Sequence, residues 1–290
     1  MNFKNIVRNA VTSIKPFKIQ TEAARHARRA YRQRFSMSQT VFAVTIIFLF
    51  LPLFVLFFYS FNDSTSMNWT GFSLRWYKRL LESRELWRAF RNSLIIAGTS
   101  AVTATILGTI GAIGVNWYKF KLRGYVQTIS FLPMILPEII IGVSLSIFFA
   151  GIRIPLGLFT IYIAHTTFNL PFVFLMVMAR LDEFDFSIIE AAHDLGATER
   201  EAMFKVTLPI CMPGIVSGFL TAVTLSLEDF VITFFVAGPG SSTLPIFIYS
   251  AITRKGGITP LISALSVVMI LGTVVLSIML RRFLKYIAAK

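Results

Sequence analysis

Residues 190–209 read Glu-Ala-Ala-His-Asp-Leu-Gly-Ala-Thr-Glu-Arg-Glu-Ala-Met-Phe-Lys-Val-Thr-Leu-Pro, and this polar stretch lies between two long apolar runs. Just before it, Ser187 followed by Glu190 has the spacing of a capping box. In that motif each of the two side chains bonds to the backbone of the other residue at the start of a helix. The spacing therefore predicts a short helix that begins near Ile188.

The second half of the stretch predicts another short helix. Gly196 can adopt the left-handed backbone conformation that closes a helix. Thr198 followed by Glu201 is a second capping box, so a helix is expected to restart there. Leu208-Pro209 should then stop it, because a residue that precedes proline disfavours the helical conformation. We expect two short helices joined at a glycine.

This polar stretch resembles the EAA loop of ATP-binding-cassette importer permeases. The matching positions are Glu190-Ala191-Ala192, Gly196, Val206, where the family more often has Ile, and Leu208-Pro209. In that family the loop forms a coupling helix that docks into a groove on a separate ATPase subunit. The residues to which the resemblance assigns this coupling role are Glu190, Ala191, Ala192, Asp194, Gly196, Leu208 and Pro209.

The composition of the chain is typical of an integral membrane protein. Hydrophobic residues make up 55% of the 290 residues, and charged residues only 14%. Several apolar runs reach the ~20 residues that a helix needs to cross a ~30 Å hydrocarbon core. The single cysteine, Cys211, excludes an internal disulfide framework. The net charge of +14 comes from basic residues outside the apolar runs or at their ends. This distribution is typical of a protein oriented in a membrane rather than of one that binds nucleic acid.

Six apolar segments predict an all-α protein with six transmembrane helices. The segments cover about residues 40–61, 92–117, 125–150, 156–179, 214–236 and 261–283. A basic extension precedes them at residues 1–39, the coupling loop occupies residues 187–209, and a short tail follows at residues 284–290. The extension lacks the cleavage site of a signal peptide, and it is expected to lie near anionic lipid headgroups.

The distribution of basic residues orients the helices. With the N-terminus inside, the cytoplasmic segments hold nineteen of the 28 Lys and Arg residues, and the outer segments hold nine. Because basic loops favour the cytoplasmic side, both termini and residues 187–209 are expected in the cytoplasm, where ATP is available. Four aromatic residues between the first two spans are expected at the outer headgroup interface, and they are Trp69, Trp76, Tyr77 and Trp87.

Three acidic residues lie within the predicted spans. Glu138 follows Pro137 directly and Pro133 by one turn, and the two prolines should break or bend that helix. Glu228 and Asp229 lie in the outer part of the fifth span. A charge inside a span costs about 2.5–3.5 kcal/mol on insertion scales. The acids either bond neighbouring helices and cap a broken one, or they line a path for a cationic solute, which the lack of Lys and Arg in these spans favours.

His165 and Asn169 are a further polar pair within a predicted span. They are one helical turn apart and share a face of the fourth span. The favoured interpretation is a hydrogen-bonded pair between helices, and the alternative is a contribution to the same solute path.

Two other stretches narrow the resemblance to the spermidine/putrescine importer permeases. One covers residues 68–77, and the other covers residues 225–232 with Phe235, Gly238-Pro239 and Leu244-Pro245 after it. That family commonly has two aspartates where this chain has Glu228-Asp229, so the carboxylate pair is retained. The resemblance covers the chain from about residue 40 onward, and the basic extension is not part of the usual pattern.

The resemblance implies a permease subunit of the type I importer fold in a bacterial inner membrane, and spermidine or putrescine as cargo. Its implied partners are a second homologous permease, two copies of a cytoplasmic ATPase and an extracytoplasmic substrate-binding protein. The chain contains no Gly-x-x-x-x-Gly-Lys-Ser/Thr phosphate loop, so ATP and Mg²⁺ would bind to the ATPase. We expect no enzymatic activity, cofactor or metal site in this chain. The candidate pathway residues are Glu138, His165, Asn169, Glu228 and Asp229.

Other functions are compatible with parts of the sequence. The same architecture could import another small amine, an aminophosphonate or an inorganic ion, as related permeases do. A stand-alone secondary carrier would need no paired capping boxes on its inner face. A membrane enzyme built from His165, Glu138 and Asp229 would lack any recognised ligand spacing such as His-Glu-x-x-His.

Overall fold

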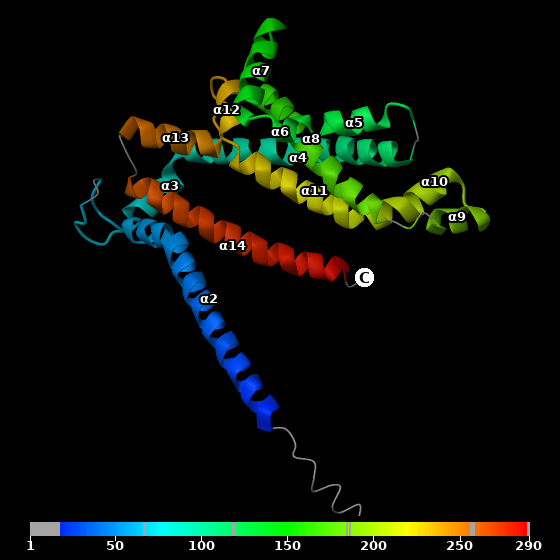
Figure 1. Ribbon diagram of the computed structural model, residues 1–290. Coiled ribbons are helices and arrows are strands. Elements are labelled where there is room, and N and C mark those ends of the chain that lie inside the picture. The colour runs from blue at the N-terminus through cyan, green and yellow to red at the C-terminus, as the bar shows by residue number, and fades with distance from the viewer. Residues whose placement is uncertain are drawn as a thin grey trace, which may run out of the picture.

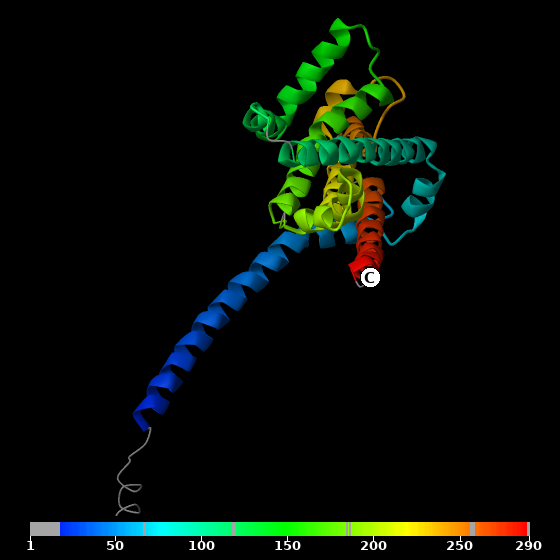
Figure 2. The same cartoon turned by 90° about the vertical axis from the view of Figure 1, so that its right-hand side faces the viewer.

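The computed structural model describes residues 18–65, 68–117, 120–183, 185, 187–255 and 259–288. Over these residues the regular secondary structure is helical, and the only β-type pairing is an isolated bridge between Asn62 and Phe72. The all-α class that the sequence predicts is thus confirmed. Figures 1 and 2 show long helices that pack side by side, with shorter helices at both ends of the bundle and along one side of it.

Three long helices form the centre of the bundle (Figure 1): α4 (Arg84–Trp117), α8 (Leu158–Asp182) and α11 (Leu208–Glu228). Their facing sides carry small and aliphatic side chains, as is typical of helices that pack in lipid. The buried members of this core are Ala101, Ala104, Ala112, Ile113, Val115, Val173, Phe174, Val177, Met178, Leu181, Cys211 and Ala222. Many of the outward-facing residues are apolar and exposed, which suits contact with lipid or another subunit.

Glycines allow the backbones of these helices to approach closely. A Cβ atom added at Gly108 of α4 would lie 3.0 Å from Cβ of Val173, and one added at Gly218 of α11 would lie 3.1 Å from Cα of Val173. Val173 of α8 is therefore held between two glycines from neighbouring helices. Added Cβ atoms at Gly98 and Gly114 of α4 would meet nothing within 4 Å, so not every glycine in this helix serves packing.

Four helical segments are long and apolar enough to cross a membrane: Met37–Tyr59, Arg84–Trp117, Leu158–Asp182 and Glu199–Glu228. A bent pair of helices makes a fifth span if the pair counts as one, and Pro260–Val275 is a shorter apolar helix. The predicted count of six transmembrane helices stays a prediction, because length and composition identify up to five spans among the described residues.

The third predicted span is broken. Helices α5 (Arg123–Ser130) and α6 (Leu132–Ile135) are separated from α7 (Glu138–Gly151) by Leu136-Pro137, where the backbone is extended. The two parts are bent by 103°. The break that the two prolines predict is confirmed, and it turns the chain by a right angle rather than kinking one continuous helix.

Helices α2 (Lys18–Tyr59) and α14 (Pro260–Ala288) lie outside the central bundle. Both views show α2 running away from the other helices, and it contacts α14. In its apolar segment Met37–Tyr59, no residue of the most hydrophobic 18-residue stretch is buried. Because α2 begins at Lys18, residues 18–39 of the basic extension continue directly into the first apolar segment, while residues 1–17 lie outside the described residues.

Short helices close one end of the bundle: α3 (Arg75–Glu82), α12 (Val231–Val236) and α13 (Leu244–Lys255). Trp76 of α3 is only 2% exposed, and its indole Nε1 donates to the carbonyl oxygen of Asn62 at 2.7 Å. The expected interfacial position is therefore wrong for Trp76, which is part of the core of this end. Trp69 and Trp87 are exposed, as the prediction requires.

Candidate functional site: coupling segment and acidic pathway

The coupling segment forms two short helices at the end of the bundle opposite α3 and α13 (Figure 1). They are α9 (Ser187–Asp194) and α10 (Glu199–Ala202). Between them Gly196 has a φ of +87°, a conformation that side chains disfavour. The N–H of Gly196 donates to the carbonyl of His193 at 2.8 Å, and that of Ala197 donates to Ala192 at 3.0 Å. These two bonds make a Schellman cap, so the predicted hinge at Gly196 is confirmed.

The second capping box is also present as predicted. The N–H of Glu201 donates to Thr198 Oγ1 at 3.3 Å, and the N–H of Thr198 donates to Glu201 Oε2 at 3.1 Å. Lys205 Nζ lies 2.8 Å from Glu201 Oε1. Hydrogen bonding from the Lys205 ammonium, together with the bonds from Thr198, lowers the pKa of Glu201 from 4.5 to about 2. The carboxylate that starts α10 is thus ionised throughout the physiological range.

Two local predictions for this segment are wrong. Ser187 is the first residue of α9 rather than its cap, and its N–H donates to Oδ1 of Asp185 at 3.0 Å. This bond lowers the pKa of the Asp185 carboxyl. Pro209 does not stop the helix, because a π-helical turn at Met203–Thr207 joins α10 to α11. In this wider turn the Leu208 N–H bonds five residues back, to Met203, and Pro209 enters α11 in its first turn, where no donor is needed.

The coupling segment has a buried apolar base and an exposed apolar tip. Ile189 and Ala202 are buried and hold the two helices against the end of the bundle, where they pack with Trp117. Leu195, beside the glycine hinge, is 89% exposed. A leucine so exposed next to a rigid turn is suited to insertion into a partner's groove. We did not predict Leu195, although a leucine directly before a helix-closing glycine was visible in the sequence.

The predicted coupling residues separate into two groups. Glu190, Ala191, Asp194 and Gly196 are exposed around the tip, and Ala192 is half-buried. Leu208 packs partly against the central core at the start of α11, and Pro209 is the second residue of that helix. The structure therefore places the first group on a surface that a partner can reach, and Leu208 and Pro209 where the segment joins the bundle.

The second feature is a break in the fifth predicted span. Helix α11 ends at Glu228, and α12 begins at Val231. The carboxylate of Asp229 lies in the gap and accepts from the N–H of Ile232 at 3.2 Å and from that of Thr233 at 2.8 Å. Asp229 therefore caps the start of α12, where a negative charge also interacts favourably with the helix dipole.

His165 connects this break to two of the central helices. Its Nε2 lies 3.1 Å from Asp229 Oδ2 and 2.8 Å from Thr233 Oγ1. Its Nδ1 lies 2.6 Å from Ser226 Oγ, which accepts from Ser100 Oγ of α4 at 3.3 Å. One buried polar network thus joins α4, α8, α11 and α12. It supports the interpretation of His165 as a bonded interhelical residue, but its partner is Asp229.

Asn169 does not take part in that network. It is fully buried, and neither atom of its side-chain amide has a hydrogen-bond partner in the part of the chain that the structure describes. The predicted hydrogen bonding between helices is therefore confirmed for His165 and wrong for Asn169. A buried amide without partners is costly, and at this position, between the central helices, it is a polar group that water or a solute could satisfy.

The other two acids lie beside the break and are exposed. Glu138 is in the first turn of α7, and its carboxylate is repelled electrostatically by Asp229 and Glu228. Helix α7 packs closely on α12, because an added Cβ at Gly142 would lie 2.9 Å from the ring of Phe235. The structure therefore brings together the three acids that the sequence singled out. Their charges are additive, and repulsion between them favours the presence of a cation.

Glu228 lies at the end of its helix. It is the last residue of α11, where the helix dipole disfavours a negative charge, and it forms no ion pair among the described residues. Phe230 follows two residues later in the chain, and its ring contacts those of Phe234 in α12 and Tyr249 in α13. The Phe230 and Tyr249 ring centroids are 4.7 Å apart. Carboxylates beside aromatic faces are suited to bind an alkylammonium group.

Within the described ranges no group of three or more His, Cys, Asp and Glu side chains is placed to hold a metal ion. His165 is already occupied by hydrogen bonds through both ring nitrogens, and Asp229 by the cap of α12. Both side chains are therefore already engaged by bonds within the protein.

Comparison with known proteins agrees with this geometry. Residues 104–290 match the family described as "binding-protein-dependent transport system inner membrane component". The chain is 38% identical over 253 residues to the spermidine/putrescine transport system permease protein PotC of Haemophilus influenzae, covering 86% of this chain and 98% of that protein. It is 42% identical over 236 residues to the putrescine transport system permease protein PotI of Escherichia coli, covering 78% and 83%.

The fold has solved relatives as well. A chain of the bacterial ABC transporter that imports the acidic polysaccharide alginate superposes with a TM-score of 0.71, covering 88% of this chain and 98% of that one, at 14% sequence identity. At that identity the likeness establishes the fold, which is that of a type I importer permease. Because the family match covers more than half of its residues, the chain belongs to the inner-membrane components of binding-protein-dependent transport systems.

Proposed function

We propose that the chain is the permease subunit of an ATP-driven importer that carries a polyamine, spermidine or putrescine, across the bacterial inner membrane into the cytoplasm. As a member of this family it is a multi-pass transport component rather than an enzyme. The observation that carries the cargo assignment is the cluster of three acids at the broken helices of this chain. Two of its relatives are named for transport of these polyamines.

The acid cluster supports a cationic cargo for electrostatic reasons. Glu138 and Glu228 are exposed on the bundle, repel one another, and lack a basic partner among the described residues. A polyamine would supply ammonium groups that neutralise them and donate charge-assisted hydrogen bonds. The exposed rings of Phe234 and Tyr249 would contact its methylene chain and ammonium groups.

Asp229 and His165 have a different task in this proposal. Their side chains are almost fully buried and are held by several hydrogen bonds. We assign them to holding the break between α11 and α12 in place, so that Glu228 is presented to the pathway. Asn169 lies further into the core, where its free amide would meet cargo or water only when the central helices separate.

Coupling to ATP would occur through the Leu195 tip and its neighbours. We assign Glu190, Ala191, Ala192, Asp194 and Gly196 to contact with a cytoplasmic ATPase, and Leu208 and Pro209 to the junction that passes movement into α11. Two ATPase copies would close on ATP and draw the coupling segments of two permeases together. The second permease would be a homologous subunit, and a substrate-binding protein would deliver cargo from outside. ATP and Mg²⁺ would bind the ATPase alone.

The main alternative keeps the architecture and changes the cargo to another small amine, an aminophosphonate or an inorganic ion. An aminophosphonate is disfavoured because its phosphonate would be repelled by the same three acids that attract its amine. A small inorganic cation is disfavoured because no group of three or more His, Cys, Asp and Glu side chains among the described residues is placed to hold one. A stand-alone carrier would give the exposed Leu195 tip no role.

Uptake by the reconstituted assembly tests the proposal. The chain would be co-expressed with a homologous permease, an ATPase and a binding protein from the same organism, purified, and placed in liposomes that contain ATP. ATP-dependent uptake of radiolabelled spermidine or putrescine is expected, with competition by the unlabelled polyamine and none by 2-aminoethylphosphonate. Uptake of the phosphonate instead, or uptake of polyamine without ATP, would contradict the assignment.

A further inference from the structure

Three arginines form an exposed cationic face at the start of α4. Arg84, Arg88 and Arg91 are spaced by four and three residues, so they lie on one side of the helix. In the ranges that the structure covers, none of them forms an ion pair. The hollow that they line has a volume of about 400 Å³, and its other lining residues are Leu81, Glu82 and Trp87.

This arrangement of charge is unfavourable for the chain by itself. The N-terminus of a helix carries a partial positive charge, which repels Arg84 and Arg88. These two residues are four apart and therefore also repel one another. Glu85 is the only acid in the first turn of α4. The face lies at the end of the bundle away from the coupling segment, on the outer side in the predicted topology, where basic residues are normally few (Figure 1). An anionic partner would remove each of these costs.

An apolar groove adjoins the arginine hollow. The two share Leu81 and Trp87, and the Nε1 of Trp87 donates to the carbonyl of Leu81 at 3.0 Å, which fixes the wall between them. The groove has a volume of about 320 Å³, within the ~300–1,000 Å³ range of small-ligand sites. Its remaining lining residues come from α3, α4, α13 and α14, and they are Tyr77, Leu80, Leu86, Phe90, Leu244, Leu265, Val268 and Met269.

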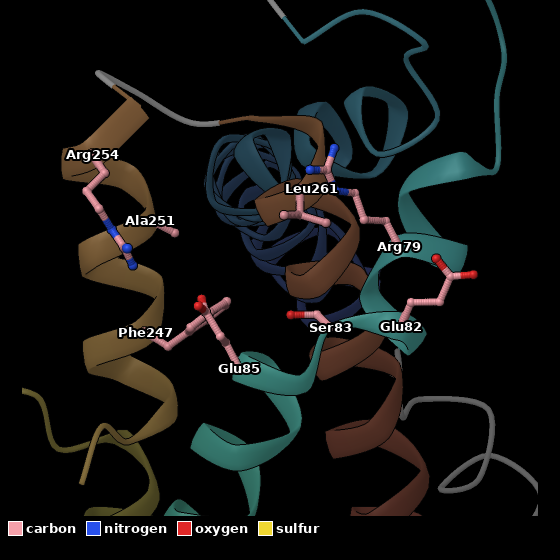
Figure 3. A pocket seen from close by; sticks show the side chains of 8 residues that line it. All are labelled: Arg79, Glu82, Ser83, Glu85, Phe247, Ala251, Arg254 and Leu261. Atoms are coloured by element: carbon pink, nitrogen blue, oxygen red, sulfur yellow. The ribbon is translucent and has the colours of Figure 1, made fainter. Parts of the chain in front are cut away.

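A third hollow at this end differs in character. It lies between α13 and the turn from α3 to α4, and Figure 3 shows that Glu85 and Arg254 enter it from different elements. Two arginines, Arg79 and Arg254, are balanced there by two acids, Glu82 and Glu85. Glu82 lines both hollows, so the Arg84–Arg88–Arg91 hollow holds three arginines against one acid, whereas this one holds two arginines against two acids.

We propose that the arginine hollow and the apolar groove together bind one anionic phospholipid of the outer leaflet. The phosphate would contact Arg88 and Arg91, with Arg84 at the rim, and one acyl chain would lie in the groove along α14. Trp87, 48% exposed between the two parts, would lie at the boundary of headgroup and hydrocarbon, where tryptophan is favoured. This site is independent of the cargo and of the coupling segment.

The groove favours a lipid over an acidic protein partner. Val268 and Met269 lie eight and nine residues into α14, about 12 Å along the helix from its start at Pro260. The groove therefore leads from the arginines toward the hydrocarbon core, where a soluble protein cannot follow. A partner that contacted only the arginines would leave the groove uncovered, and with it Leu81, which is 70% exposed.

Lipid retention by the full-length chain, purified in detergent with its co-expressed partner subunits, tests the proposal. After delipidation, phosphatidylglycerol or phosphatidylcholine with matched acyl chains is added back, and bound lipid is counted by native mass spectrometry. The variant Arg88→Gln/Arg91→Gln is expected to lower phosphatidylglycerol binding about tenfold or more, since each basic residue near an anionic lipid contributes appreciably. The matched control is Lys78→Gln/Arg153→Gln, which removes two cations from the same side without touching either hollow.

A second variant tests the groove. Val268→Phe fills it without changing charge, and because Val268 is 47% exposed the helix should fold normally. Loss of phosphatidylglycerol binding in both test variants, with retention in the control and no binding of glycerol 1-phosphate, supports the lipid site. Unchanged binding in either test variant, or equal loss in the control, overturns it. Retained lipid with weakened docking of the binding protein in Arg88→Gln/Arg91→Gln also overturns it, and would assign the face to an acidic protein.

Discussion

Nε2 of His165 lies 3.1 Å from Oδ2 of Asp229, and the two side chains are only 2% and 5% exposed. His165 is in α8, and Asp229 lies 64 residues further along the chain, in the gap where α11 ends and α12 begins. The pair fixes the broken span against α8. The pair also distinguishes two neighbouring acids. The carboxylate of Asp229 is held by hydrogen bonds within the protein, whereas Glu228 forms no ion pair among the described residues.

Asp229→Asn should reduce stability and transport together. The carboxylate accepts from two backbone N–H groups and from Thr233 Oγ1, and an amide can keep only part of this set. A loss of about 1–3 kcal/mol is expected for such a buried group. The measurement is thermal unfolding of the purified assembly beside polyamine uptake. Reduced uptake at an unchanged melting temperature would mean that Asp229 contacts cargo directly.

Glu228→Gln should reduce transport alone. Glu228 is exposed and forms no ion pair within the described residues, so the substitution removes a charge without breaking an internal bond. Loss of one charge-assisted contact to an ammonium group should raise the KM for spermidine about tenfold. Glu228→Asp, which keeps the charge, is the matched control. Equal KM values for Glu228→Gln and the original chain would remove Glu228 from the pathway.

Gly218→Ala should destabilise the central bundle. The new Cβ would lie 3.1 Å from Cα of Val173, a backbone atom that cannot rotate away. Overpacking of this kind costs about 1–3 kcal/mol. Gly98→Ala on α4 is the control, because its Cβ would meet nothing within 4 Å. Similar melting temperatures for the two variants would contradict the close approach of α8 and α11.

The sequence was most informative where structure is set by near neighbours. The Gly196 hinge and the Thr198–Glu201 box each depend on bonds within six residues, and both are present. The break at Pro137 likewise follows from the lack of an N–H on proline. These features needed no knowledge of the tertiary structure.

The features that were missed depend on distant packing or on a choice between local alternatives. That His165 finds partners and Asn169 finds none is decided by how α8 packs against α11 and the start of α12, which spacing along one helix cannot show. The passage of the helix through Pro209 depends on a π-helical turn, which a local rule for proline does not include. The exposure of Leu195 could be known only once Ile189 and Ala202 were seen to hold the other side of the segment.

The start of α10 should resist acid. Glu201 has its pKa lowered to about 2, chiefly by the hydrogen bond from Lys205, so its stabilising effect is full above about 4.5 and is lost only as the pH falls toward 2. Hydrogen exchange at the Glu201 and Ala202 amides, corrected for intrinsic rate, should show equal protection at pH 7 and pH 5. Glu201→Gln should lower that protection at both values. A decline in the original chain between pH 7 and pH 5 would contradict the low pKa.

Gly196→Pro should separate ATP hydrolysis from transport. Proline fixes φ near −65°, so it cannot adopt the +87° observed, and its missing N–H removes the bond to His193. The Leu195 tip would then point elsewhere while the central core, which does not include this segment, keeps its packing. The expected result is an assembly with normal melting behaviour whose ATPase activity no longer rises with cargo and binding protein, and whose uptake falls by at least about tenfold.

Two further variants decide what the loss at Gly196 means. Gly196→Ala keeps the N–H and adds only the cost of a left-handed alanine, about 1–2 kcal/mol, so it should retain most of the coupling. Leu195→Ala keeps the turn and removes the tip, so it should weaken the copurification of the ATPase. If Gly196→Pro transports normally, the segment does not transmit force. If Leu195→Ala binds the ATPase as tightly as the original chain, docking depends on the polar residues around the tip and not on the leucine.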